Sequence, residues 1–149
     1  MQTGQIIRAL SGFYDVQSEG KIYRTRARGN FRKRKITPLV GDFVEFESES
    51  ETESGYILEI LDRKNEMIRP PVANIDNAVV IVSAVEPAFS LNLLDRFLIY
   101  IESLHMQGLV YLTKTDMISD QQYQEISDYL AYYAKIGYQI FAPRTKKIS

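Results

Sequence analysis

The chain has 149 residues, of which 45% are hydrophobic and 25% charged, with a formal net charge of −1. This composition is typical of a globular protein; because no apolar run approaches a membrane span and no signal-peptide pattern is present, we expect a cytoplasmic protein without a membrane partner. The lack of cysteine and the single histidine, His105, exclude disulfides and metal sites built from cysteine or several histidines.

The first 68 residues are expected to form an all-β barrel. Short segments with strand character are separated by closely spaced turn signals, and five strands in about 60 residues fit the OB fold. In the fourth strand, Val44 and Phe46 should face one side while Phe43 and Glu45 face the other. The expected strands are Gly4–Leu10, Phe13–Val16, Lys21–Arg26, Asp42–Glu47 and Tyr56–Leu61.

Charge is unevenly distributed along this barrel. Residues 21–35 contain eight basic residues and no acidic one, whereas residues 42–62 contain eight acidic residues and no basic one. Lysine and arginine interleaved with aromatic residues can pair with phosphates and stack on exposed bases, which favours RNA binding. The alternative is a solvated basic loop balanced by the acidic hairpin of residues 47–54. The expected RNA-binding residues are Arg24, Arg26, Arg28, Phe31, Arg32, Lys33, Arg34 and Lys35.

A second domain is expected from residue 72, after the stiff Arg69-Pro70-Pro71 connector. Residues 78–83 form a continuous apolar run, typical of a strand buried on both faces of a parallel sheet. Further periodicity predicts a helix from the N-cap Ser90, a strand at 109–112, a helix over 121–136 and a strand at 138–141.

Capping residues delimit the second of these helices. Asp120 is expected to cap its start, and Gly137 lies where a left-handed residue would end it. The β-α-β-α-β order predicts a parallel sheet with its binding site at the carboxyl ends of the strands.

The tetrapeptide Thr113-Lys114-Thr115-Asp116 directly follows the predicted strand that ends at Leu112. A carboxylate at a strand end can accept two hydrogen bonds from N1–H and the exocyclic amine of guanine, which adenine cannot offer, so Asp116 is the expected discriminator. Lys114 would cover the purine with its aliphatic stem and anchor neighbouring loops with its ammonium. The tetrapeptide resembles the Asn-Lys-x-Asp motif of GTPases, with Thr113 replacing the asparagine.

Nearly the whole chain resembles the ribosome small subunit-dependent GTPase A family. The similarity includes residues 38–42 (Pro-Leu-Val-Gly-Asp), 63–65 (Arg-Lys-Asn), 69–76, 83–87 and 94–98. It implies an OB barrel followed by a circularly permuted GTPase domain, in which the guanine motif precedes the phosphate loop. It also implies a role in late 30S maturation, with 16S rRNA and GTP as partners, Mg²⁺ in the complete GTPase domain, and a zinc module in the full-length family.

The sequence departs from the family at the catalytic motifs. It contains no Gly-x-x-x-x-Gly-Lys-Ser/Thr and no Asp-x-x-Gly. We therefore expect a β + α/β protein, with an OB barrel at 1–68 and a truncated, P-loop GTPase-like domain at 72–149 in which residues 145–149 complete no element. We expect no catalytic residue and little or no GTP hydrolysis.

Two other functions stay open. The first is a stand-alone, non-enzymatic RNA-binding barrel with the α/β part as a scaffold. The second is an unrelated small-molecule enzyme, for which the sequence offers no nucleophile and base pair. We expect a monomer, and the alternative is self-association through the unpaired edge of an incomplete sheet.

Overall fold

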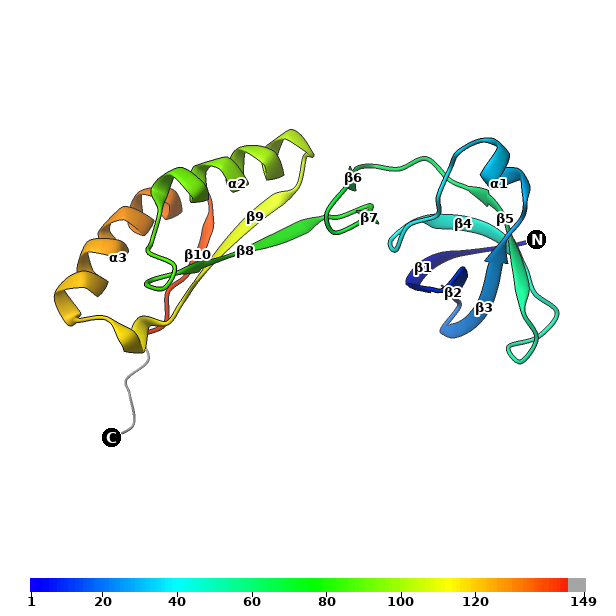
Figure 1. The fold of residues 1–149 in the computed structure, drawn as a ribbon, viewed down its shortest axis with the longest axis horizontal. Helices are drawn as coiled ribbons and strands as arrows, with labels where there is room; N and C mark the ends of the chain where they lie inside the picture. Colours follow the sequence, from blue (N-terminus) through cyan, green and yellow to red (C-terminus); the bar gives the residue numbers. More distant parts are fainter. Residues whose placement is uncertain (145–149) are drawn as a thin grey trace. The chain divides into compact units, whose positions relative to one another are not determined.

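The computed structural model describes residues 1–144, and the expectation for residues 145–149 lies outside them. The chain forms two compact units, the first over Met1–Ile75 and the second from Asp76 onward (Figure 1). The two proline residues at 70 and 71 therefore lie inside the first unit.

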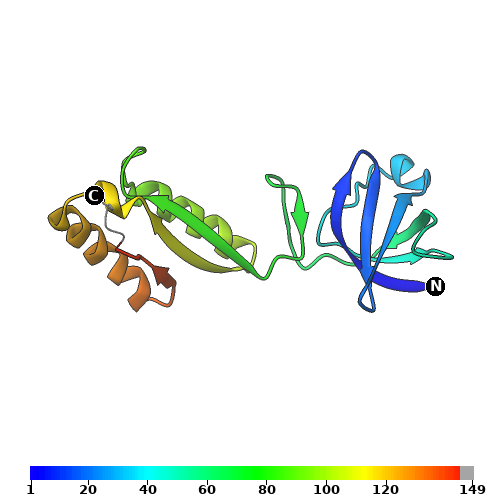
Figure 2. The same ribbon diagram turned by 90° about the horizontal axis from the view of Figure 1, so that it is seen from below.

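Five strands of the first unit close into a barrel in the order β1-β2-β3-β5-β4 (Figure 2). The β3–β5 pairing is parallel and the others are antiparallel. This barrel confirms the OB-type prediction, and every strand lies within two residues of its expected bounds at each end. The strands are β1 (Gln2–Leu10), β2 (Phe13–Ser18), β3 (Lys21–Ala27), β4 (Phe43–Glu47) and β5 (Gly55–Ile60).

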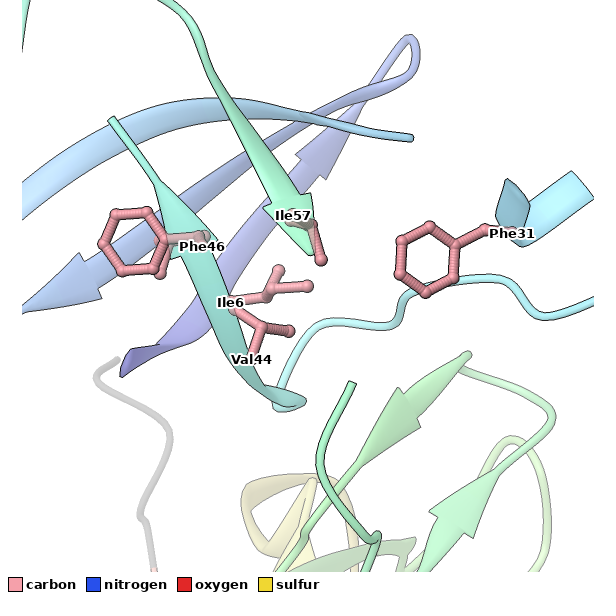
Figure 3. Close-up of a cluster of buried hydrophobic side chains, with 6 residues drawn as sticks. Ile6, Phe31, Val44, Phe46 and Ile57 are labelled. Atoms are coloured by element: carbon pink, nitrogen blue, oxygen red, sulfur yellow. The ribbon is translucent and has the colours of Figure 1, made fainter. Parts of the chain in front are cut away.

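Apolar side chains fill the barrel (Figure 3). The expected alternation in β4 is confirmed, because Val44 and Phe46 are fully buried whereas Phe43 is exposed. A short helix, α1 (Asn30–Lys33), adds Phe31 to this core. The sequence pattern did not predict α1. The buried core residues are Ile6, Val16, Phe31, Val44, Phe46 and Ile57.

A two-stranded ribbon, β6 (Glu66–Met67) and β7 (Val72–Ala73), packs against the barrel. Gly41 has a φ of +97°, and a Cβ at this position would lie 1.9 Å from the carbonyl oxygen of Ala73. The Asn65 side chain fixes the chain after the ribbon by donating to the carbonyl oxygen of Ile75 and accepting from its backbone N–H, at 2.7 Å each. Residues of the 38–42 and 63–65 segments therefore hold the ribbon in place.

The second unit is a parallel sheet in the order β10-β9-β8, with two helices on one face. This arrangement confirms the β-α-β-α-β prediction. The Ser90 side chain caps α2 as expected, by accepting a hydrogen bond from the backbone of Leu93 at 3.2 Å. The elements are β8 (Asn77–Ser83), α2 (Leu91–Ser103), β9 (Gln107–Thr113), the 3₁₀ turn η1 (Thr115–Met117), α3 (Asp120–Lys135) and β10 (Gln139–Phe141).

Two details of this unit differ from the predictions. Ser119, rather than Asp120, caps α3, because its side chain forms a reciprocal capping box with Gln122. In β8, Val80 and Val82 are buried, but Val79 is exposed. The expectation that β8 is buried on both faces was therefore wrong for the described residues. Gly137 has a φ of +113° just after α3, as expected.

Within residues 1–144, no helix combines the length and apolar character needed to cross a bilayer.

Candidate functional site

The Thr113–Asp116 segment lies at the carboxyl end of β9, next to the end of β8. The Thr113 carbonyl accepts a hydrogen bond from the backbone of Ala84 at 3.0 Å, and its hydroxyl donates to the carbonyl of Val82 at 3.3 Å. Threonine at the first position of the motif thus still braces the two strand ends together.

Lys114 adopts a left-handed backbone conformation with a φ of +59°. Its ammonium donates a hydrogen bond to the carbonyl oxygen of Glu86, in the loop that follows β8. The expected anchoring of a neighbouring loop by Lys114 is therefore present in the structure, and Glu86 is the partner that sequence reasoning did not identify.

Thr115 and Asp116 differ sharply in burial. Thr115 is buried, and its hydroxyl donates to the carbonyl of Pro143 at 2.7 Å, which ties the loop to the segment after β10. Asp116 is exposed, and its carboxylate has no hydrogen-bond or ion-pair partner within residues 1–144. The loop therefore has a fixed backbone and a free carboxylate, which is the chemistry that guanine recognition needs.

Metal ligands are not gathered in this part of the chain. Among residues 1–144, no three His, Cys, Asp or Glu side chains come together in a way that could hold a metal ion. Residues 1–144 therefore contain no cluster of three such side chains for the Mg²⁺ or the zinc that the family resemblance implies.

Three basic residues of the 21–35 segment have acidic partners. Lys21 pairs with Glu51 at 3.3 Å and Arg28 with Glu47 at 3.3 Å. The hydrogen bond and charge of Glu51 raise the pKa of Lys21. A third pair joins Arg34 to Glu59 at 3.5 Å. Acidic residues therefore offset part of the basic segment, and Glu47 and Glu51 belong to the acidic hairpin.

The remaining basic residues of the segment are exposed and have no carboxylate within 4.0 Å among the residues described. They lie on β3, on α1 and directly after α1. Because no described carboxylate forms an ion pair with them, they form the stronger candidate surface for phosphates. They are Arg24, Arg26, Arg32, Lys33 and Lys35.

Phe31 requires a correction. It was expected to stack on RNA bases, but it is only 2% exposed and packs in the barrel core. Its ring lies under the guanidinium of Arg34, 5.1 Å from ring centroid to Cζ. Phe31 therefore positions α1 and cannot contact a base in this conformation.

An aromatic residue that the sequence analysis did not single out lies beside the basic residues of β3. The guanidinium carbons of Arg24 and Arg26 lie 4.2 and 4.3 Å from the ring centroid of Phe13. No pattern within one strand indicates this contact, because it depends on the β2–β3 register, which pairs Phe13 with Arg26.

Two family models match this sequence. The model described as RsgA N-terminal domain matches residues 3–57, and the model described as RsgA GTPase matches residues 60–148. The second match alone includes more than half of the chain.

Curated relatives carry the description "Small ribosomal subunit biogenesis GTPase RsgA". The protein from Latilactobacillus sakei is 89% identical over 145 residues, which are 97% of this chain and 48% of the relative. The protein from Limosilactobacillus reuteri is 58% identical over 144 residues, again 97% of this chain and 48% of the relative. This chain thus spans about half the length of the curated relatives it matches.

Two solved structures have the same fold over nearly the whole chain. YloQ, described as a circularly permuted GTPase, superposes with a TM-score of 0.83 at 48% identity, over 95% of this chain and 51% of YloQ. YjeQ from Thermotoga maritima superposes with a TM-score of 0.81 at 28% identity, over 95% of this chain and 51% of YjeQ.

Proposed function

This chain belongs to the RsgA GTPase family, and on that premise we propose that it acts in biogenesis of the small ribosomal subunit. In this proposal the barrel binds 16S ribosomal RNA of the 30S subunit in the cytoplasm, and the Thr113–Asp116 loop binds the base of GTP. The name of the relatives and the exposed charges of the barrel support the RNA partner.

The observation that carries the proposal is the group of basic residues without acidic partners. Each lysine or arginine that neutralises a phosphate releases condensed counterions, so its contribution to RNA affinity depends steeply on salt concentration. Residues already paired with glutamate release fewer counterions, because RNA must first displace the carboxylate. Arg32, Lys33 and Lys35 should therefore contribute more than Lys21, Arg28 and Arg34.

The nucleotide part of the proposal rests on the braced loop and the free Asp116 carboxylate. The sequence contains neither the phosphate-loop motif nor Asp-x-x-Gly, so the residues of this chain offer contacts to the base only. We expect weak nucleotide binding and no phosphate release above the blank when the purified chain is incubated with GTP and Mg²⁺.

Binding to purified small ribosomal subunits across a salt series tests the RNA partner. Two variants with equal charge change are compared, Arg32→Ala/Lys33→Ala/Lys35→Ala and Lys21→Ala/Arg28→Ala/Arg34→Ala. The first should bind more weakly than the second and lower the slope of log affinity against log salt by roughly 2 to 3. Absence of salt-dependent binding by the unmodified chain, or equal effects of the two variants, would contradict the proposal.

A further inference from the structure

On the proposed function that the barrel binds RNA, we propose that the outer face of β1, β2 and β3 is a stacking site for one unpaired nucleobase. The site consists of Phe13, Arg24 and Arg26, with Arg8 and Asp15 at its edge. This site is distinct from α1, on or directly after which lie the other basic residues of the 21–35 segment without an ion pair, namely Arg32, Lys33 and Lys35.

Strand register brings these residues to one face. Phe13 on β2 pairs with Arg26 on β3, and Asp15 pairs with both Arg24 on β3 and Arg8 on β1. The alternate residues of β2 point inward, since Val16 is fully buried in the core. Cross-strand neighbours on one sheet face have Cβ atoms about 5 Å apart, so the five side chains form one continuous patch.

The Phe13 ring holds two guanidinium groups, with Cζ atoms 4.2 and 4.3 Å from the ring centroid. The attraction of each cation to the ring quadrupole orients it over the aromatic face. No carboxylate lies within 4.0 Å of Arg8, Arg24 or Arg26 in the described part of the chain. The ring thus orients both guanidiniums, and neither forms an ion pair within the described residues.

A guanidinium that lies over a ring leaves its other planar face available. Unpaired RNA bases stack on such planes as they do on aromatic rings, whereas bases in a duplex are stacked on each other. Phosphate binding alone would need only charge, which the lysines near α1 supply. The aromatic support under Arg24 and Arg26 is therefore best explained by a planar ligand.

Asp15 limits which base fits. Together with Arg8, Leu10, Phe13 and Arg24, it lines an open hollow of about 260 Å³. A carboxylate repels phosphate and accepts a hydrogen bond from an exocyclic amine such as N4 of cytosine, which uracil lacks. The site should therefore prefer a cytosine over a uracil, although the two bases have rings of the same size.

The test measures binding of short single-stranded oligocytidylate and oligouridylate, and of a duplex, by fluorescence anisotropy. Arg24→Lys/Arg26→Lys keeps both charges but removes both planar guanidinium groups, and Arg69→Lys/Arg96→Lys, which changes two exposed arginines outside the proposed RNA-binding residues in the same way, is the matched control. The double variant should bind oligocytidylate about fivefold to a hundredfold more weakly, the range expected for one stacked base, with an unchanged salt slope. The control should change binding by less than about twofold.

Phe13→Leu is a second variant that removes the aromatic support and keeps an apolar side chain. It should reproduce the loss for oligocytidylate, with thermal unfolding showing that the barrel is intact. If RNA binds with normal salt dependence but Arg24→Lys/Arg26→Lys and Phe13→Leu match the unmodified chain, the stacking site is refuted and the proposed function stands. Equal losses for duplex and single strand also refute it. If the unmodified chain binds no RNA, both proposals fail.

Discussion

The fully buried carboxylate of Asp42 accepts two hydrogen bonds from the guanidinium of Arg63, one at each oxygen and each 2.8 Å long. One oxygen also accepts from the backbone N–H of Leu39, at 2.7 Å. The hydrogen bond to Asp42 is the main cause that raises the pKa of Arg63. This pair joins the turn before β4 to the segment after β5. It thus connects the 38–42 and 63–65 segments, both of which carry the family resemblance.

We predict that Asp42→Ala destabilises the barrel by about 3 kcal/mol, because removal of one partner from a buried ion pair leaves the other charge uncompensated. Arg63 keeps two other contacts, to the carbonyl of Thr37 and to Glu66, both at 2.9 Å, so the loss should lie at the lower end for buried pairs. Urea unfolding measures the change. Glu66→Gln removes an exposed partner of the same guanidinium and should cost less than about 1 kcal/mol; similar losses in both variants would contradict the prediction.

We predict that the two faces of the parallel sheet respond differently to truncation. Leu112 is 1% exposed beneath the helices, and Leu112→Ala should destabilise the second unit by about 2 to 5 kcal/mol. Ile81 is 68% exposed, and Ile81→Ala should change the free energy of unfolding by less than about 0.5 kcal/mol. Chemical denaturation of both variants checks this, and a large loss for Ile81→Ala would mean that the open face is covered in solution.

Strand β8 shows which features the sequence could predict and which it could not. The run of apolar residues at 78–83 identified β8, and local alternation identified the barrel strands, because both signals depend on neighbouring residues. Which face of β8 is covered depends on where α2, the next helix along the chain, packs, and no pattern within the strand carries that information. The four-residue α1 was missed since it is too short to show helical periodicity, and with it the burial of Phe31 was missed. The Phe13 contacts cross from one strand to another and appear only once the register is known.

We predict that the second unit loses stability between about pH 10 and pH 12. Burial and the hydrogen bond to Asp95, 2.5 Å long, raise the pKa of Tyr133 from 10.0 to about 12. Burial and the hydrogen bond to Glu102 raise the pKa of Tyr138 from 10.0 to about 12 as well. Since the folded state holds these protons more tightly than the unfolded chain, the stabilisation is complete below pH 10 and is lost as pH rises through the folded pKa.

Thermal unfolding across this pH range, followed with tyrosinate absorbance, measures the effect. Tyr133→Phe should weaken the alkaline dependence, and Tyr129→Phe, which changes an exposed tyrosine of the same helix, should leave it unchanged. A pH profile of Tyr133→Phe equal to that of the unmodified chain would contradict this assignment.

We predict that the acidic hairpin weakens RNA binding by the barrel. Glu47 and Glu51 pair with Arg28 and Lys21, so Glu47→Gln/Glu51→Gln frees two cations and removes two negative charges near the RNA. Affinity for single-stranded RNA should rise several-fold at low salt, and the difference should shrink as salt screens the charges. Glu125→Gln/Asp128→Asn makes the same charge change on α3 and should have a smaller effect. An equal rise in both variants would mean that net charge alone, and not the two ion pairs, limits binding.

We predict that Asp116→Asn changes the preferred base from guanine to xanthine. The carboxylate offers two acceptors that match N1–H and the exocyclic amine of guanine, whereas an amide offers one acceptor and one donor, which match N1–H and the 2-oxo group of xanthine. Loss of a charge-assisted hydrogen bond should weaken guanosine binding roughly tenfold to a hundredfold. Binding of guanosine and xanthosine, followed by NMR shifts of the Lys114 and Asp116 amides, measures both effects. Asp120 lies one turn further along and is also exposed, so Asp120→Asn should change neither guanosine nor xanthosine binding. If Asp116→Asn leaves guanosine binding unchanged, or if no nucleoside shifts these amides, the α/β unit is a scaffold for the RNA-binding barrel.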